Sequence, residues 1–161
     1  MNYANMIQSI NNPMIDMRSD TVTKPTRGML DAMVNASVGD DVYGDDPTAN
    51  ELQEFAAKLL GKEDALFLAS GTQSNLCAML THCQRGEEII TGEHYHIFDS
   101  EAGCASVLGG IMFAPISNNS KGGLDISDVV GKIKPNDSHY AITKMLSLEN
   151  THDGMVQTVS E

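Results

Sequence analysis

The sequence predicts an α/β fold built around a largely parallel β-sheet. Helical and strand-like segments alternate along the 161 residues, with no internal repeat and no long linker, as expected where helices connect parallel strands. A hydrophobic content of 41% suffices for one globular domain with a core.

The first part of the chain is expected to form two helices separated by a loop. Residues 25–35 carry apolar side chains on one side and predict a short helix. Residues 38–47 are dominated by glycine and aspartate and predict a loop. The second helix is expected to begin at Thr48, where Thr48 and Glu51 fit a capping box, and to end at Gly61.

Four short apolar runs predict strands at residues 65–69, 88–91, 111–115 and 145–149. Three further segments have helical character: residues 70–82, 101–108 and 126–133. Polar residues follow three of the four strands, at residues 70–72, 94–96 and 150–152. Ligands of open α/β sheets bind at the carboxyl ends of the strands, so these polar segments are expected to converge there.

The charge and composition exclude several classes of partner. A net charge of −12 argues against nucleic acid and anionic membranes, which both need a basic surface. No apolar run approaches the roughly 20 residues of a membrane span.

The cysteines form no Cys-x-x-Cys pair, which favours free thiols in a reducing compartment. Residues 1–13 resemble neither a signal nor a transit peptide and are interpreted as a flexible extension. We therefore expect a cytoplasmic protein whose domain covers residues 14–161.

Residues 70–73, Ser-Gly-Thr-Gln, stand where a strand is expected to give way to a helix. Backbone N–H groups at a helix N-terminus bind phosphate, and Gly71 would allow a close approach while Thr72 adds a hydroxyl donor. An ordinary helix start explains the segment equally well. It is not a P-loop, because the Gly-Lys-Ser/Thr element is absent.

The histidines offer several kinds of chemistry. His94 and His96 could form a metal pair with a carboxylate such as Asp99 or Glu101, but an imidazole lying on a cofactor ring, or a plain loop histidine, fits better. His139 and His152 flank the last expected strand and could transfer protons. Glu149 lies among polar residues at the end of that strand, where such groups need partners.

The glycine- and aspartate-rich loop invites comparison with a calcium site. Its acidic residues lack the alternate spacing and the final glutamate of an EF-hand loop. We therefore expect a tight loop held by hydrogen bonds.

Five blocks along the chain resemble the threonine aldolases in order: Met-Arg-Ser-Asp-Thr-Val-Thr (17–23), Val-Gly-Asp-Asp-Val-Tyr-Gly-Asp-Asp-Pro (38–47), Ser-Gly-Thr-Gln (70–73), the loop that holds His96 with Glu-Ala-Gly (101–103), and Leu-Glu-Asn-Thr-His (148–152). The resemblance runs from Met14 to about Val156 and is strongest to bacterial low-specificity L-threonine or L-allo-threonine aldolases. It implies the N-terminal portion of the large domain of a fold-type-I pyridoxal-phosphate enzyme, a three-layer αβα arrangement, truncated here. It also implies a homo-oligomer, dimer or tetramer, with active sites between paired subunits.

The resemblance assigns roles residue by residue. Ser70, Gly71 and Thr72 match the loop that binds the cofactor phosphate, and His96 matches the histidine stacked on the pyridine ring. His139 matches a second active-site histidine, implicated with the substrate hydroxyl, so that His96 and His139 are the implied catalytic residues. Ser19 matches the serine that receives the substrate carboxylate. Tyr43 matches a residue near the substrate and the subunit boundary.

The implied reaction cleaves threonine or allo-threonine to glycine and acetaldehyde, with pyridoxal 5'-phosphate as the electron sink. In relatives the Schiff-base lysine, the aspartate that contacts the pyridine nitrogen and two arginines lie beyond the position of Glu161. The Ser-Lys-Gly tripeptide of this sequence, at residues 120–122, lies before that position and is not in the place of the family's lysine, so we expect this chain to be inactive alone. Two alternatives remain: a naturally short, non-catalytic member that pairs with a full-length subunit, and another pyridoxal-phosphate lyase that performs β-elimination.

Overall fold

The computed structural model describes residues 15–158, and the expected extension at residues 1–13 lies outside them. The chain divides into two compact units, one up to Phe67 and one from Leu68 onward. Each unit is described by itself.

The first unit consists of two short 3₁₀ turns and two helices. These are η1 (Asp20–Val22), α2 (Arg27–Asn35), η2 (Asp41–Tyr43) and α3 (Pro47–Leu60). Both predicted helices are confirmed, and Gly61 ends α3 in a left-handed conformation at φ 62°. The predicted capping box at Thr48 is wrong. Asp46 caps α3 by accepting the N–H of Ala49, because Pro47 takes the first helical position.

The loop before α3 is tight and internally hydrogen bonded, as predicted. Its aspartates accept backbone N–H groups, including that of Gly39 by Asp46 at 3.0 Å and that of Val42 by Asp40 at 2.9 Å. A Cβ atom at Gly39 would lie 2.3 Å from the carbonyl oxygen of Asp45, so this position needs glycine. The N–H groups that Asp46 accepts lower the pKa of its carboxyl.

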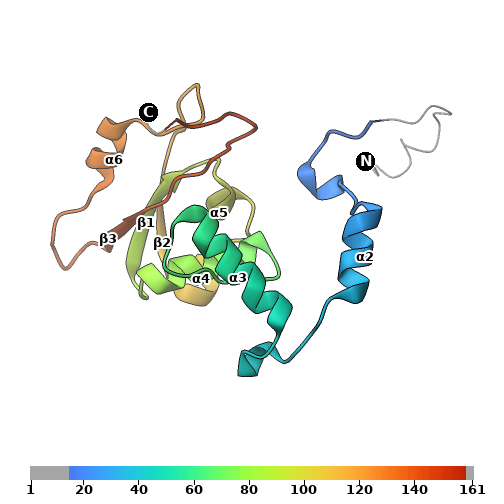
Figure 1. Ribbon diagram of the computed structural model, residues 1–161. Helices are drawn as coiled ribbons and strands as arrows, with labels where there is room; N and C mark the ends of the chain where they lie inside the picture. Colours follow the sequence, from blue (N-terminus) through green and yellow to red (C-terminus); the bar gives the residue numbers. More distant parts are fainter. Residues whose placement is uncertain (1–14, 159–161) are drawn as a thin grey trace. The chain divides into compact units, whose positions relative to one another are not determined.

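The second unit is organised around a parallel sheet of β1 (Glu87–Gly92), β2 (Met112–Ile116) and β3 (Ile142–Leu146), in the order β2-β1-β3 (Figure 1). Helix α4 (Gly71–His82) precedes β1. The short helix α5 (His96–Asp99) and a π-helical turn η3 (Ala105–Gly109) lie between β1 and β2, and α6 (Ile126–Lys132) leads to β3. The predicted parallel α/β arrangement is confirmed.

Helical layers cover both faces of the central strand. Ile89 belongs to a buried cluster with Met79 of α4, Ile97 of α5 and Ala105 of η3. The next residue, Ile90, packs with Val129 of α6 and two residues of β2 in a second cluster. Successive side chains of a strand point to opposite faces, so α4 and α6 lie on opposite sides of the sheet (Figure 1).

Two strand predictions are wrong. Residues 65–69 form no strand, and Leu66 and Phe67 are exposed. The N–H groups of Phe67 and Ala69 bond to glutamine side chains instead, because no neighbouring strand accepts them. The last strand lies three residues earlier than predicted and includes the polar residues Thr143 and Lys144. An edge strand with one accessible side can carry polar residues, so the apolar run alone did not mark where this strand begins.

Within residues 15–158, no helix is long and apolar enough to cross a membrane.

Candidate functional site

The loops that follow the three strands meet at the carboxyl edge of the sheet, as expected for two of the three polar segments. The N–H of His94 donates to Asn118 Oδ1 at 3.1 Å, which joins the loop after β1 to the loop after β2. The N–H of His96 donates to Glu149 Oε2 at 2.5 Å, which joins it to the loop after β3. The third segment, at Ser70, begins α4 without a preceding strand.

A buried aromatic pair underlies this junction. Tyr95 is buried, and its hydroxyl donates to the carbonyl oxygen of Gly122 at 3.1 Å. Its ring meets the buried imidazole of His152 edge to face at a centroid distance of 5.4 Å. His152 Nδ1 in turn lies 3.2 Å from Glu149 Oε1. Burial raises the pKa of Tyr95, so this phenol stays a neutral donor.

The imidazole of His96 is half exposed and held at one nitrogen. Its Nδ1 lies 2.8 Å from Oε1 of Glu101, whose side chain is wholly buried. The same oxygen accepts from Asn75 Nδ2 of α4 at 2.6 Å. His96 is therefore tied to α4 through one carboxylate, and its Nε2 is left for another partner.

The start of α4 is capped by a side chain and presents backbone N–H groups. Ser70 caps the helix by accepting the N–H of Gln73 at 3.1 Å. The N–H groups of Gly71 and Thr72 have no acceptor within the helix. A Cβ atom at Gly71 would meet no other atom within 4 Å, so the approach is open. Asn75, four residues after Gly71, lies on the same side of the helix and donates to Glu101, which also contacts His96.

His139 is not brought together with His96. It precedes β3, and the first residue of that strand, Ile142, pairs with Glu87 at the beginning of β1. His96 follows the other end of β1, which is roughly 16 Å away at 3.3 Å per residue. The exposed ring of His139 bonds to Asp137 at 2.7 Å, and the hydrogen bonds from His139 lower the pKa of Asp137.

Two predicted substrate residues belong to the first unit. The Ser19 hydroxyl caps η1 by accepting the N–H of Thr21 at 3.2 Å. Tyr43 ends η2 and its side chain is exposed. The neighbouring Arg18 is engaged by Asp16 at 2.6 Å, and this guanidinium holds the pKa of Asp16 down to about 2.

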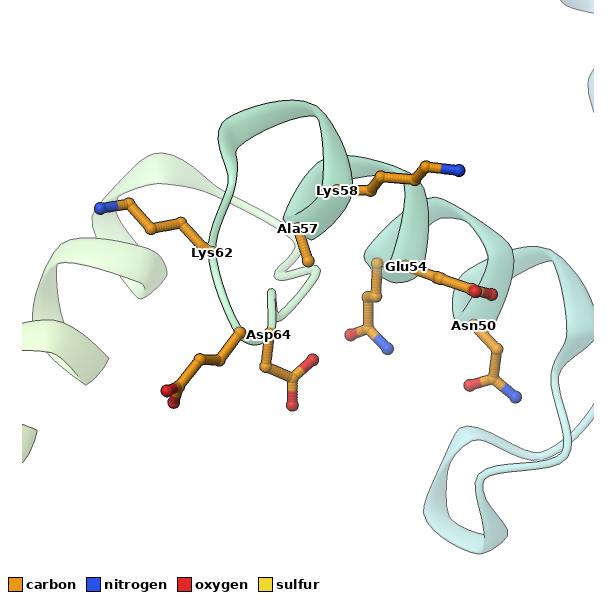
Figure 2. A pocket seen from close by; sticks show the side chains of 8 residues that line it. Asn50, Glu54, Ala57, Lys58, Lys62 and Asp64 are labelled. Carbon is orange, nitrogen blue, oxygen red and sulfur yellow. The ribbon is translucent and has the colours of Figure 1, made fainter.

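Two hollows lie away from the start of α4 and from His96, although Tyr95 and Glu149 border the larger one. One borders α3 in the first unit, where Lys58 and Lys62 extend in different directions (Figure 2). A larger cavity of about 1030 Å³ lies on the α6 side of the sheet, with apolar walls from residues such as Leu124, Val129 and Leu148. Neither is lined by Gly71, Thr72 or His96, so neither coincides with the predicted phosphate turn.

The sequence indicated no role for Asn75, only a possible metal-ligand role for Glu101, and only a need for partners at Glu149. The acidic Glu101 five residues after His96, and the polar residues that follow a strand at Glu149, are signals that could have indicated their contacts with His96.

Comparison with known proteins identifies the family. A family model described as beta-eliminating lyase matches residues 16–161. The low specificity L-threonine aldolase of Escherichia coli (strain K12) is 60% identical over 143 residues, which are 89% of this chain and 43% of that protein. The low-specificity L-threonine aldolase 1 of Arabidopsis thaliana is 45% identical over 141 residues, 86% of this chain and 39% of that protein.

A solved structure of Leishmania major threonine aldolase has the same fold. It matches with a TM-score of 0.66 and 26% identity, over 83% of this chain and 39% of that chain. The chain thus spans about two fifths of the length of these relatives. It belongs to the beta-eliminating lyase family and, within that family, is a homologue of the threonine aldolases.

Proposed function

We propose that this polypeptide forms part of a pyridoxal-phosphate-dependent threonine aldolase, which cleaves threonine or allo-threonine to glycine and acetaldehyde. The observation that carries the proposal is the 60% identity to the Escherichia coli low specificity L-threonine aldolase over 89% of this chain. The relatives named as threonine aldolases do not favour β-elimination or a non-catalytic role.

The second unit supports binding of a phosphorylated, planar cofactor. The N–H groups of Gly71 and Thr72, at the positive end of the α4 dipole, would bind the phosphate. Ser70 keeps that helix start in place through its cap. His96 offers a half-exposed ring of fixed orientation, which would stack on the cofactor ring. When bound, pyridoxal phosphate supplies an electron sink for cleavage of the Cα–Cβ bond.

Further roles follow from the resemblance. Ser19 would bind the substrate carboxylate, and Tyr43 would lie near the substrate at a subunit boundary. His139 would act on the substrate hydroxyl. Because His139 and His96 lie at opposite ends of the sheet, a site that uses both would take one of them from another subunit. We therefore propose a homo-oligomer with shared sites.

Turnover also needs a lysine that binds the cofactor covalently. The resemblance puts that lysine beyond the position of Glu161, and the Ser-Lys-Gly tripeptide at residues 120–122 lies well before it. We propose that the 161-residue chain binds the cofactor reversibly and has no aldolase turnover by itself.

We also propose a cytoplasmic location, with which the free thiols at all three cysteines agree.

A hybrid enzyme tests this function. Residues 16–156 would replace the matching region of the Escherichia coli aldolase, which would supply the remaining groups of the site. The hybrid should release glycine and acetaldehyde from L-threonine or L-allo-threonine, whereas the 161-residue chain should release none. An inert hybrid that folds and binds the cofactor would contradict the proposal for this chain. Glycine release by the 161-residue chain would contradict its proposed inactivity.

A further inference from the structure

Glu101 is a charged group in an unusual position. Its side chain is wholly buried, although it lies next to a half-exposed histidine. A buried carboxylate is costly unless hydrogen bonds or charges compensate it. His96 is one of its hydrogen-bond partners.

Three side chains direct hydrogen-bonding groups at this carboxylate. Asn75 Nδ2 lies 2.6 Å and His96 Nδ1 2.8 Å from Oε1, while Cys104 Sγ lies 3.6 Å from Oε2. Burial and the charge of Glu101 raise the pKa of the Cys104 thiol, so the thiol remains protonated and donates. This pattern fits an ionised Glu101 that accepts from all three groups.

We propose that Glu101 is a positioning residue, which fixes the neutral His96 imidazole as the Nδ1–H tautomer and leaves Nε2 as its unprotonated, outward-facing nitrogen. One hydrogen bond to a ring nitrogen determines which nitrogen carries the proton. The ring plane is fixed at the same time, because the Nδ1–H bond must point toward Oε1 of Glu101.

Asn75 extends this control to the start of α4. It lies four residues after Gly71 and bonds to the same oxygen of Glu101 as His96. The ring of His96 is thereby tied to α4 one turn after Gly71. The relevance of this network to the cofactor rests on the proposed function, whereas the tautomer of His96 does not.

The backbone of His96 is held separately. Its N–H donates to Glu149, which lies in the loop after β3 and not in the Glu101 network. Loss of the Glu101 carboxylate should therefore free the ring while the start of α5 stays in place. A merely structural role for Glu101 would change stability without changing the tautomer.

The tautomer can be measured directly on this chain without cofactor. Long-range proton–nitrogen correlation spectra distinguish Nδ1–H from Nε2–H imidazoles. The spectra would be recorded at about pH 8.5, where ordinary histidines are neutral. His94 is an internal control, since it is exposed and its Nε2 lies 3.7 Å from Glu93. We expect His96 to be the Nδ1–H form and His94 to show the opposite preference. A His96 ring in the Nε2–H form would overturn the proposal, and this measurement needs no variant.

Substitutions at Glu101 and Glu149 then test whether the Glu101 carboxylate determines the tautomer of His96. Glu101→Gln keeps the size of the side chain but removes its charge, and should lower the ratio of Nδ1–H to Nε2–H at His96 about tenfold. The matched control Glu149→Gln alters the backbone contact and should leave that ratio unchanged. An unchanged ratio in Glu101→Gln that remains folded by circular dichroism would overturn the proposal.

Cofactor titration separates this inference from the proposed function. If the wild-type chain shows the Nδ1–H form but pyridoxal phosphate does not perturb Gly71 or His96, the positioning role stands and the proposed cofactor site fails. If the cofactor perturbs both residues while His96 is the Nε2–H form, the cofactor site stands and the positioning role fails.

Discussion

Glu149 Oε2 accepts the backbone N–H of His96 at 2.5 Å, although 53 residues separate them in the sequence. This bond fastens the start of α5 to the loop after β3. His152 supports Glu149 from the other side, with Nδ1 3.2 Å from Oε1. The backbone of the histidine proposed to stack on the cofactor is therefore held by a segment that lies much later in the sequence.

Removal of this carboxylate should loosen the start of α5. Glu149→Ala leaves the N–H of His96 without its acceptor, and we expect a loss of about 1–3 kcal/mol in the free energy of unfolding. Hydrogen exchange of the His96 amide should accelerate in parallel. Asp153→Ala is the control, because Asp153 is exposed and 3.8 Å from His152. Equal protection of the His96 amide in both variants would contradict the assigned contact.

A large side chain at Gly71 should harm cofactor binding more than folding. The structure leaves open space at the Cβ position of Gly71, and its φ is not in the left-handed region. We expect Gly71→Leu to change the free energy of unfolding by no more than about 0.5 kcal/mol. Pyridoxal phosphate should bind at least about tenfold more weakly, since the side chain covers the N–H groups.

Gly131 of α6 is a matched control, because it has equally open surroundings in a different helix. Gly131→Leu should keep the cofactor affinity of the wild type. Similar losses of affinity in both variants would argue against a specific phosphate turn at α4.

The two histidines of the loop after β1 should differ in function. His96 is tied to Glu101, whereas His94 contacts Glu93 only at 3.7 Å. In the hybrid enzyme, His96→Ala should lower kcat/KM by at least about tenfold, and His94→Ala should stay near the unmodified hybrid. Comparable losses from both substitutions would contradict the assignment of His96.

The chain is expected to associate in solution. Apolar side chains of the segments predicted as strands are accessible, with Leu66 71% and Leu146 44% exposed. Within residues 15–158, β3 is an edge strand whose one partner is β1. Size-exclusion chromatography with light scattering at several concentrations should show species larger than the 17.3 kDa monomer. A sharp monomer peak together with cooperative thermal unfolding would contradict this prediction.

Acid titration should reveal the ion pair between Arg18 and Asp16 through the low pKa of Asp16. The hydrogen bonds from Arg18 lower the pKa of Asp16 to about 2, below its ordinary value near 3.9. A lowered pKa in the folded state stabilises the structure above about pH 4, and this contribution disappears as the pH falls toward 2. Carboxyl carbon NMR should show the low pKa, and Arg18→Gln should raise it toward the ordinary value. An unchanged pKa in that variant would contradict the pairing.

Much of the fold could be predicted from the sequence, because its signals are local. The spacing of apolar residues predicted α2, α3, α4 and α6, and Gly61 correctly marked the end of α3. The strand predicted at residues 65–69 was wrong because strand formation also needs a partner for the backbone. An apolar run such as Leu66 to Leu68 does not specify that partner.

The candidate site was only partly predictable for a related reason. His96 and the turn at Gly71 could be found by resemblance, and the polar residues after β3 were expected to need partners. The role of Glu101 depends on contacts with Asn75, 26 residues away, and with His96. Such contacts become visible only when the chain is folded.

We propose that the start of α4 and His96 form one cofactor site, and a single titration tests this site. Pyridoxal phosphate would be added to the 161-residue chain while its backbone amides and histidine rings are followed by NMR. We predict saturable shifts concentrated at the amides of Gly71 and Thr72 and at the ring of His96. No saturable shift at these residues, or saturable shifts confined to other parts of the chain, would contradict the account.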